Sequence, residues 1–287
     1  MGKVTEGVTV RSRLRFEDFK PLSSKSLRLL LAPLYAWFSP RLKGIENFNP
    51  QRPTLFVGNH ALYGVIDSPL FVSEVYRKSG VYLRPLGDHF HFRTDGWGAA
   101  LIRMGAVPGT PENCARLMQL QQHILVFPGG AREVAKRRSE INRIEWKKRT
   151  GFARMAIQHG YDIIPFAAGG CDESMDILID ADDVQSTRLG RWLLKRPAIN
   201  RFLRNGDLIM PLARGVGPTL IPRPEPFWFQ LGTPIETRSL EGRTDDETLW
   251  ALREQVAGQI TGMIDELVEQ RRQAPLSGWR KRLLKRP

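Results

Sequence analysis

The feature that most constrains the fold of this chain is a set of short apolar runs, each of which ends abruptly at a loop or turn. The runs lie at residues 54–57, 124–127 and 162–168, and helix-like segments occupy 111–122 and 148–159. Short strands that alternate with helices are typical of layered α/β proteins. The sequence therefore predicts an α/β fold with a mixed, largely parallel sheet flanked by helices.

Two helix starts can also be placed from the sequence. Asp67-Ser68-Pro69 combines a capping side chain with a proline at the first helical position. Near the C-terminus, Thr244 is followed three residues later by Glu247, which is the spacing of a capping box. The apolar stripe of that last helix predicts a face buried in the core, and it consists of Leu249, Leu252, Val256, Ile260, Met263 and Leu267.

The chain is long and apolar enough to bury a substantial core, with 287 residues of which 41% are hydrophobic, and this excludes general disorder. Without an internal repeat or a low-complexity linker, one domain over 49–270 is expected. Residues 188–222 break the alternation and are basic, which predicts an insertion that faces a membrane. An amphipathic, interfacial N-terminal segment, 1–48, and a basic C-terminal tail, 271–287, complete the predicted organisation.

No apolar run reaches the ~18 residues that a membrane-spanning helix needs. The longest candidate, 29–38, contains Pro33, Tyr35 and Trp37. It is typical of a segment that lies at a bilayer interface, and a core helix packed on the domain is the alternative. The two cysteines form no disulfide framework, and the first 26 residues lack the apolar centre of a signal peptide. We therefore expect a cytoplasmic protein bound peripherally to the cytoplasmic face of the membrane.

The net charge of +13 predicts an anionic partner. The positive charge is concentrated at 134–149, 188–214 and 271–287. Such patches suit the phosphates of nucleic acid, of lipid headgroups or of a soluble cofactor, and each can also be a solvated surface. Because Trp192 and Trp279 lie among the cations and no nucleic-acid motif is recognisable, an anionic membrane is favoured over nucleic acid.

The first loop with candidate chemistry follows the strand at 54–57. Asn59, a candidate substrate contact, and His60 lie where open α/β sheets usually bind ligands. An imidazole can remove a proton from a hydroxyl near neutral pH, and a carboxylate on its other ring nitrogen stabilises the imidazolium. Asp67 is the nearest carboxylate, and Gly64 favours a turn that brings it to His60. A purely structural histidine is the alternative.

The second loop, Phe-Pro-Gly-Gly-Ala-Arg-Glu at 127–133, follows another apolar run. Gly129 and Gly130 allow backbone N–H groups to approach an anion or a developing oxyanion. Arg132 can clamp a phosphate or carboxylate with two hydrogen bonds, and Glu133 is a further candidate substrate contact. A plain turn with a surface salt bridge is the alternative.

Together these motifs resemble the glycerolipid acyltransferases of the 1-acylglycerol-3-phosphate type. The resemblance covers roughly residues 50–240, with a second motif around 104–110, and it is closest to the branch of diacylglycerol and phytyl-ester acyltransferases. The positions that match the family's motifs are His60, Phe127, Pro128, Gly130, Arg132 and Pro165.

The departures from the family pattern concern the acceptor. Asp67 follows His60 after six intervening residues, where the family has four. Gly129, Ala131 and Glu133 stand where the family motif has Glu, Thr and Ser. This loss of polar groups favours a neutral acceptor, a diacylglycerol or a long-chain alcohol, whereas a lysophospholipid remains the alternative because an arginine is kept.

The resemblance implies acyl transfer from an acyl thioester to a lipid hydroxyl, with no cofactor, no metal and no acyl-enzyme. His60 is the implied general base, Asp67 orients it, and acyl-CoA or acyl-ACP is the co-substrate. A non-catalytic basic protein that binds lipid or nucleic acid is the alternative function. His89 and His91 would share a face on a strand and can suggest a metal, but no third ligand is evident and a role in a substrate groove or in packing is preferred.

Overall fold

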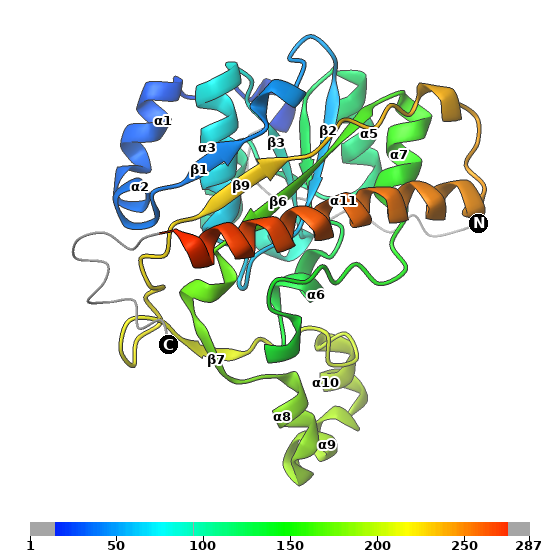
Figure 1. Ribbon diagram of the computed structural model, residues 1–287. Helices are drawn as coiled ribbons and strands as arrows, with labels where there is room; N and C mark the ends of the chain where they lie inside the picture. Colours follow the sequence, from blue (N-terminus) through cyan, green and yellow to red (C-terminus); the bar gives the residue numbers. More distant parts are fainter. Residues whose placement is uncertain (1–14, 94, 275–287) are drawn as a thin grey trace.

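The centre of the molecule is a mixed sheet of seven strands in the order β1-β9-β6-β2-β5-β3-β4. The computed structural model describes residues 15–93 and 95–274 (Figure 1). The strands of this sheet are β1 (Arg41–Lys43), β2 (Thr54–Gly58), β3 (Arg84–Gly87), β4 (Val107–Pro108), β5 (Ile124–Val126), β6 (Asp162–Gly169) and β9 (Trp228–Leu231). Neighbouring strands are parallel except for the antiparallel pair β6 and β9. The predicted α/β fold with a largely parallel sheet is therefore confirmed.

Helices cover both faces of the sheet (Figure 1). The α-helices are α1 (Ser24–Leu30), α2 (Ala32–Phe38), α3 (Asp67–Ser79), α4 (Asp95–Arg103), α5 (Pro111–Gln119), α6 (Gly130–Val134), α7 (Gly151–His159), α8 (Ala181–Ser186), α9 (Arg188–Leu194), α10 (Pro197–Phe202) and α11 (Asp246–Gln273). Helices α5, α7 and α11 pack on one face, and α2 and α3 pack on the other.

Strand β2 shows how the sequence builds these layers. Its side chains alternate between the two faces, so Leu55 and Val57 join the core beneath α5, α7 and α11, whereas Phe56 joins the core beneath α2 and α3. All three are almost completely buried. Burial of such a side chain contributes about 1.5–3 kcal/mol, which explains why the run is apolar throughout.

The N-terminal helices combine buried and exposed apolar residues. Leu27 and Phe38 are buried, while Leu29 is 77% and Leu30 is 58% exposed. Helix α1 packs on α3, and β1, which follows α2, pairs with β9 in the sheet. The segment thus packs on the domain and also presents apolar surface to solvent. In the described ranges, no helix has the length and apolar character needed to cross a membrane.

The two helix starts differ from the predictions in their first turns. Helix α11 is capped by Asp245, whose side chain accepts a hydrogen bond from the N–H of Thr248, so Thr244 is not the cap. Helix α3 begins at Asp67 itself, and the Asp67 carboxylate accepts the N–H of Ala61 in the preceding loop. The predicted apolar stripe of α11 is buried, as expected.

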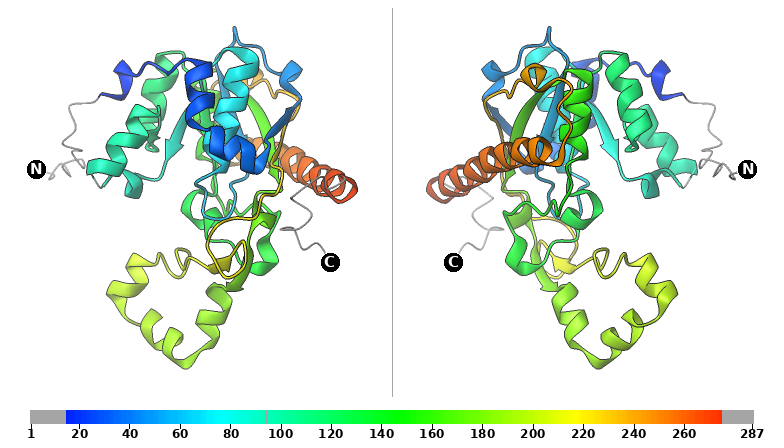
Figure 2. Two further views of the ribbon diagram at one scale, coloured as in Figure 1. Left: turned by 90° about the vertical axis from the view of Figure 1, so that its left-hand side faces the viewer. Right: turned by 90° about the vertical axis from the view of Figure 1, so that its right-hand side faces the viewer.

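Residues 176–214 form an arm that projects from the sheet (Figures 1 and 2). Its base is an antiparallel ribbon of β7 (Asp176–Ile179) and β8 (Leu212–Arg214), and its outer part consists of α8, α9 and α10. The arm starts before the predicted insertion at 188–222, which contains α9, α10 and β8 but not β7 or α8. Residues 275–287, most of the predicted basic tail, lie outside the described residues.

Candidate active site

The loop between β2 and α3 brings His60 and Asp67 into direct contact. Nδ1 of His60 lies 2.8 Å from Oδ2 of Asp67. The reversal that allows this uses Tyr63 and Gly64, both in the left-handed region with φ of 63° and 62°. A Cβ atom at Gly64 would lie 2.6 Å from Nε2 of His60, so this position requires glycine. The turn expected from the sequence is present.

Asp67 is held as an anion by its surroundings. Burial alone would raise the pKa of Asp67, but the adjacent His60 and the backbone N–H groups of Ala61 and Ser68 outweigh it and lower the pKa. The carboxylate is 2% exposed. A buried carboxylate on Nδ1 fixes the tautomer of the imidazole, which leaves Nε2 as the nitrogen that can accept a proton.

The His60 ring also connects the two predicted loops. It stacks on Phe127 with a centroid separation of 3.8 Å and an interplanar angle of 7°. Phe127 directly follows β5, which is the parallel neighbour of β2, so both loops leave the sheet at the same edge. The His60 side chain is 14% exposed, and its Nε2 has no hydrogen-bond partner in the described part of the chain. The site is therefore partly open to a small reacting group.

The diglycine turn is fixed by an arginine that the sequence analysis did not single out. Arg149 donates through Nη1 to the carbonyl oxygens of Pro128 at 2.7 Å and Gly129 at 2.6 Å. Gly130 has φ of 49° and donates its N–H to the carbonyl of Phe127. The N–H of Gly129 makes no hydrogen bond among the described residues. Arg149 appears in the sequence only as one cation of a basic segment, so no spacing signal identifies it.

Arg132 is engaged by protein groups. It is 6% exposed and forms an ion pair with Glu140. Its Nη1 donates to the carbonyl of Ala135 at 3.4 Å, and its Nε lies 3.8 Å from a carboxylate oxygen of Asp207 in the arm. The expected phosphate clamp is thus occupied by Glu140, and Arg132 links α6 to the arm.

Glu133 and Asn59 are buried, which argues against direct contact with a substrate. Glu133 has no exposed surface, and neither of its carboxyl oxygens has a hydrogen-bond partner within the described residues. Burial raises the pKa of Glu133 to about 7, against the opposing charges of Lys136 and His60. Asn59 exchanges two hydrogen bonds with the backbone of Ala168 and so joins the end of β2 to β6.

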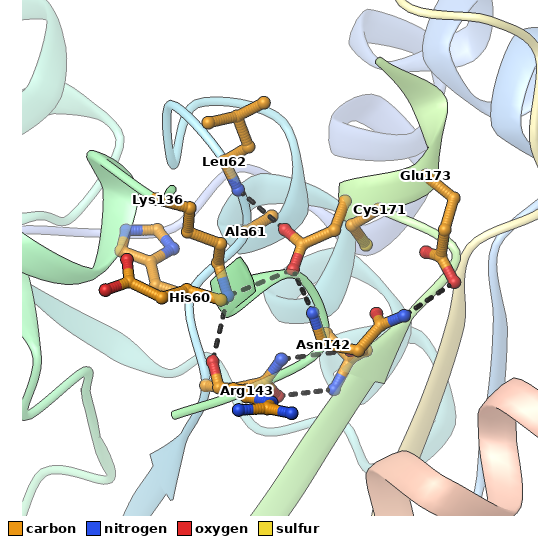
Figure 3. Close-up of polar contacts among 12 residues, drawn as sticks. His60, Ala61, Leu62, Lys136, Asn142, Arg143, Cys171 and Glu173 are labelled. Carbon is orange, nitrogen blue, oxygen red and sulfur yellow. Dashed lines mark hydrogen bonds and ion pairs between the residues drawn. The ribbon is translucent and has the colours of Figure 1, made fainter. Parts of the chain in front are cut away.

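A buried ion pair behind the loop was also missed by the sequence analysis. Lys136 has no exposed side-chain surface, and its Nζ lies 3.0 Å from Oδ2 of Asp172. Asp172 in turn accepts the backbone N–H groups of Leu62 and Asn142 (Figure 3). Burial alone would lower the pKa of Lys136, but Asp172 and Glu133 raise it. This cluster anchors the His60 loop to the segment that follows β6.

A small cavity of about 40 Å³ lies beside the loop, lined among others by Ala61, Asp67 and Cys171. It has room for about one water molecule and none for a hydrocarbon chain.

His89 and His91 do not lie on a strand. These residues lie on a short 3₁₀ helix, η3 (His89–Phe92), where alternate residues do not share a face. Within residues 15–93 and 95–274, no cluster of three His, Cys, Asp or Glu side chains has the arrangement of a metal site.

Comparison with known proteins is consistent with this geometry. Residues 39–169 match the family model described as acyltransferase. Over 246 residues the chain is 28% identical to phytyl ester synthase 2 of Arabidopsis thaliana. This alignment covers 82% of this chain and 35% of that protein. It is 29% identical over 160 residues to the human DGAT1/2-independent enzyme synthesizing storage lipids, covering 56% of this chain and 47% of that enzyme.

A solved structure shares the fold. The 1-acyl-sn-glycerophosphate acyltransferase PlsC from Thermotoga maritima aligns with a TM-score of 0.52 at 15% identity, over 89% of this chain and 81% of that one. The chain spans about a third of the length of the phytyl ester synthases that it matches. The family match runs through both the His60 loop and the diglycine turn, so residues 39–169, which hold both candidate loops, are similar to the acyltransferase family.

Proposed function

We propose that the protein is an O-acyltransferase that moves a fatty acyl group from an acyl thioester, acyl-CoA or acyl-ACP, to a lipid hydroxyl. The observation that carries the proposal is the 2.8 Å contact between His60 and Asp67, in a segment that matches the acyltransferase family model and also contains the diglycine turn. The names of the relatives, a phytyl ester synthase and an enzyme synthesizing storage lipids, support a lipid acceptor.

In this mechanism Nε2 of His60 removes the proton from the acceptor hydroxyl as its oxygen attacks the thioester carbonyl carbon. The resulting tetrahedral intermediate collapses with cleavage of the C–S bond, and the leaving thiolate takes the proton from the imidazolium. The Asp67 carboxylate stabilises the imidazolium between these steps. No acyl-enzyme forms, so the hydroxyl must reach Nε2 while the thioester is bound.

The diglycine turn is the proposed oxyanion site. Because a trans peptide directs its C=O and N–H to opposite sides, the bonds from Arg149 to two carbonyls turn the following N–H groups away from the guanidinium. The N–H of Gly129 is then available for the developing oxyanion. Arg149 is a positioning residue in this scheme.

A neutral acceptor, a diacylglycerol or a long-chain alcohol, fits the site better than a phosphate-bearing one. Arg132, the residue best suited to clamp a phosphate, is paired with Glu140 and linked to Asp207. A lysophospholipid acceptor would have to displace these carboxylates. We also propose that the protein works at an anionic membrane on its cytoplasmic face, where such lipids reside.

The test is to incubate the purified protein with a long-chain acyl-CoA and a panel of acceptors, and to measure thiol release and ester formation. We expect ester formation that depends on an alcohol or diacylglycerol and falls by ~10² or more in His60→Ala, since general-base catalysis typically contributes ~10² to 10⁴. His91→Ala, which alters an exposed imidazole, is the matched control. Near-normal turnover in His60→Ala would remove His60 from the mechanism, and vesicle binding without turnover by the unmodified protein would favour a lipid-binding role.

A further inference from the structure

The arm contains an apolar cavity that the proposed chemistry does not yet use. It has a volume of about 320 Å³ and lies among α8, α9 and α10. Leucine and isoleucine side chains form most of its wall, and they include Leu193, Leu194, Ile199, Leu203, Leu208 and Ile209. Among the residues that the structure describes, no charged or polar side chain lines it. Its volume falls in the range of small-molecule sites, ~300–1,000 Å³.

The lining determines what kind of molecule can fill this cavity. A polar ligand would lose its hydrogen bonds to water and gain none from these walls, which costs several kcal/mol. A saturated hydrocarbon chain has no hydrogen bonds to lose, and the burial of each methylene stabilises the complex by about 0.8 kcal/mol. The chemistry of the wall therefore selects an unbranched or branched alkyl group.

The cavity is connected to the candidate active site through two contacts. Met210 lines the cavity, and the next residue, Pro211, accepts a hydrogen bond of 2.7 Å from the hydroxyl of Tyr63 in the His60 loop. On the other side, Asp207 precedes the lining residue Leu208 and lies 3.8 Å from Arg132. The residues that adjoin the wall at its two ends, Pro211 and Asp207, thus contact the two loops of the site.

Charges around the cavity suit the polar end of the same ligand. Arg188 on α9, Lys195 just after it and Arg201 on α10 are exposed, and none of them forms an ion pair within the described residues. A fatty acyl substrate carries its negative charge on a carrier phosphate or, as a free acid, on its carboxylate. An apolar cavity whose helices α9 and α10 also carry exposed cations therefore complements such a molecule.

We infer that the arm cavity binds the alkyl chain of the acyl substrate and sets the chain length that the protein prefers. This inference rests on the proposed function, because the acyl group is the substrate of the proposed reaction. The cavity beside Asp67, with only about 40 Å³, cannot hold the chain, whereas the arm offers a larger apolar space whose neighbouring residues Pro211 and Asp207 contact the two loops.

The first test measures binding without turnover. The full-length protein is titrated with cis-parinaric acid, a fluorescent fatty acid, in the absence of vesicles. Leu203→Trp places a larger side chain in the cavity, and we expect it to weaken binding by about tenfold or more, a loss equivalent to ~1.4 kcal/mol. Leu189→Trp is the matched control, because Leu189 lies on α9, is 65% exposed and does not line the cavity.

The second variant, Ile199→Ala, enlarges the cavity and keeps the test valid if Leu203→Trp does not fold, as judged by circular dichroism. Displacement of the probe by saturated fatty acids should shift toward longer chains in Ile199→Ala. Equal affinity of the native protein, Leu203→Trp and Leu189→Trp for the probe would overturn the inference, as would an unchanged chain-length profile in Ile199→Ala.

These outcomes separate the inference from the proposed function. Probe binding that Leu203→Trp weakens supports the cavity even if no acyl transfer is detected. Conversely, if the protein transfers acyl groups but Leu203→Trp does not change its affinity for the probe, the proposed function stands and the inference about the arm cavity is wrong.

Discussion

Glu133 carries a buried carboxyl group without a hydrogen-bond partner in the described residues, directly behind the His60 loop. The charged and titratable groups that act on it are Lys136, His60 and Asp172. Its pKa is raised by burial from 4.5 to about 7. Between these two values the folded protein holds a proton that the unfolded chain releases, so Glu133 makes the protein less stable as pH rises through this window.

This sign gives a prediction for Glu133→Gln, which mimics the neutral acid at every pH. Near pH 4.5 the variant should be about as stable as the native protein. Near pH 8 it should be more stable, by on the order of 3 kcal/mol, because the native carboxyl must ionise in a buried site. Urea unfolding between pH 4.5 and 8 measures the difference, and Glu241→Gln, at an exposed position, is the control. A difference that does not change with pH would contradict this account of Glu133.

Gly64 allows a second prediction at the scale of one residue. Gly64→Ala places Cβ 2.6 Å from Nε2 of His60 and 2.5 Å from a methyl group of Val134, in addition to the strain of a positive φ. Gly160 has nearly the same φ, 63°, and open space around its Cβ position. We expect Gly160→Ala to cost about 1 kcal/mol and to keep activity. Gly64→Ala should cost more and also lower acyl transfer.

Thermal unfolding and acyl transfer, measured side by side on the two alanine variants, provide the test. Equal stability losses together with unchanged activity in Gly64→Ala would show that the loop does not hold the His60 ring in place.

The sequence was sufficient to predict the contact between His60 and Asp67, because both residues lie in one loop with a glycine between them. It was not sufficient for Arg149, Lys136 and Asp172. Their partners lie about 20 to 110 residues away along the chain and are brought close only by the fold of the sheet. Nothing in local spacing distinguishes such a cation from a solvated one.

At the scale of elements, the residue that caps the N-terminus of α11 differs from the one that the sequence pattern predicts. Thr244 with Glu247 fits a capping box, but Asp245 caps the helix through its bond to the N–H of Thr248. Asp245→Ala should therefore cost about 1 kcal/mol of stability, the usual effect of losing an N-cap side chain. Thr244→Ala should change stability by a few tenths of a kcal/mol at most. Chemical denaturation of both variants measures these stability losses. A larger loss in Thr244→Ala than in Asp245→Ala would show that Thr244 is the N-cap after all.

The strands β2, β5 and β6 were predictable because each is a short apolar run bounded by turn residues. The helices of the arm were not, since α8, α9 and α10 have six or seven residues each and no long apolar period. Short helices of this kind depend on caps and on tertiary contacts more than on pattern. Asp180 and Thr187 cap α8 and α9.

At the scale of the whole molecule, the predicted basic segments differ in whether their cations form ion pairs. Cations of 134–149 pair with acids of the arm: Arg137 with Asp182 and Arg138 with Asp183, at 2.8 and 2.6 Å. The charges of Arg137 and Arg138 are therefore largely neutralised, and the two ion pairs attach the arm to the segment that follows α6. The exposed cations Arg188, Lys195 and Arg201 of the arm form no such pair within the described residues.

The outer part of the arm also carries large exposed apolar side chains. Leu189, Trp192 and Phe202 are 65%, 52% and 70% exposed on α9 and α10. Cations interleaved with exposed aromatic and aliphatic groups are typical of a surface that binds an anionic bilayer. The arm is thus the part of the described molecule best suited to dock on a membrane, with the active-site loops at its base.

This arrangement predicts how the protein partitions onto vesicles. Replacement of Arg188, Lys195 and Arg201 by serine removes three cations that form no ion pair in the described residues, and each basic residue near an anionic surface contributes ~1 kcal/mol. Binding to vesicles rich in anionic lipid should fall roughly 100-fold, as ~3 kcal/mol requires.

The matched control replaces three exposed cations outside the arm, Arg103, Lys148 and Arg243. Both triple variants lower the net charge from +13 to +10, so a general effect of net charge would weaken both equally. Sedimentation with vesicles at rising salt measures partitioning, and the native protein should lose affinity as the ions screen the arm. Because equal losses in the two variants would mean that the whole cationic surface attracts the bilayer, only a loss confined to the arm variant supports docking through α9 and α10.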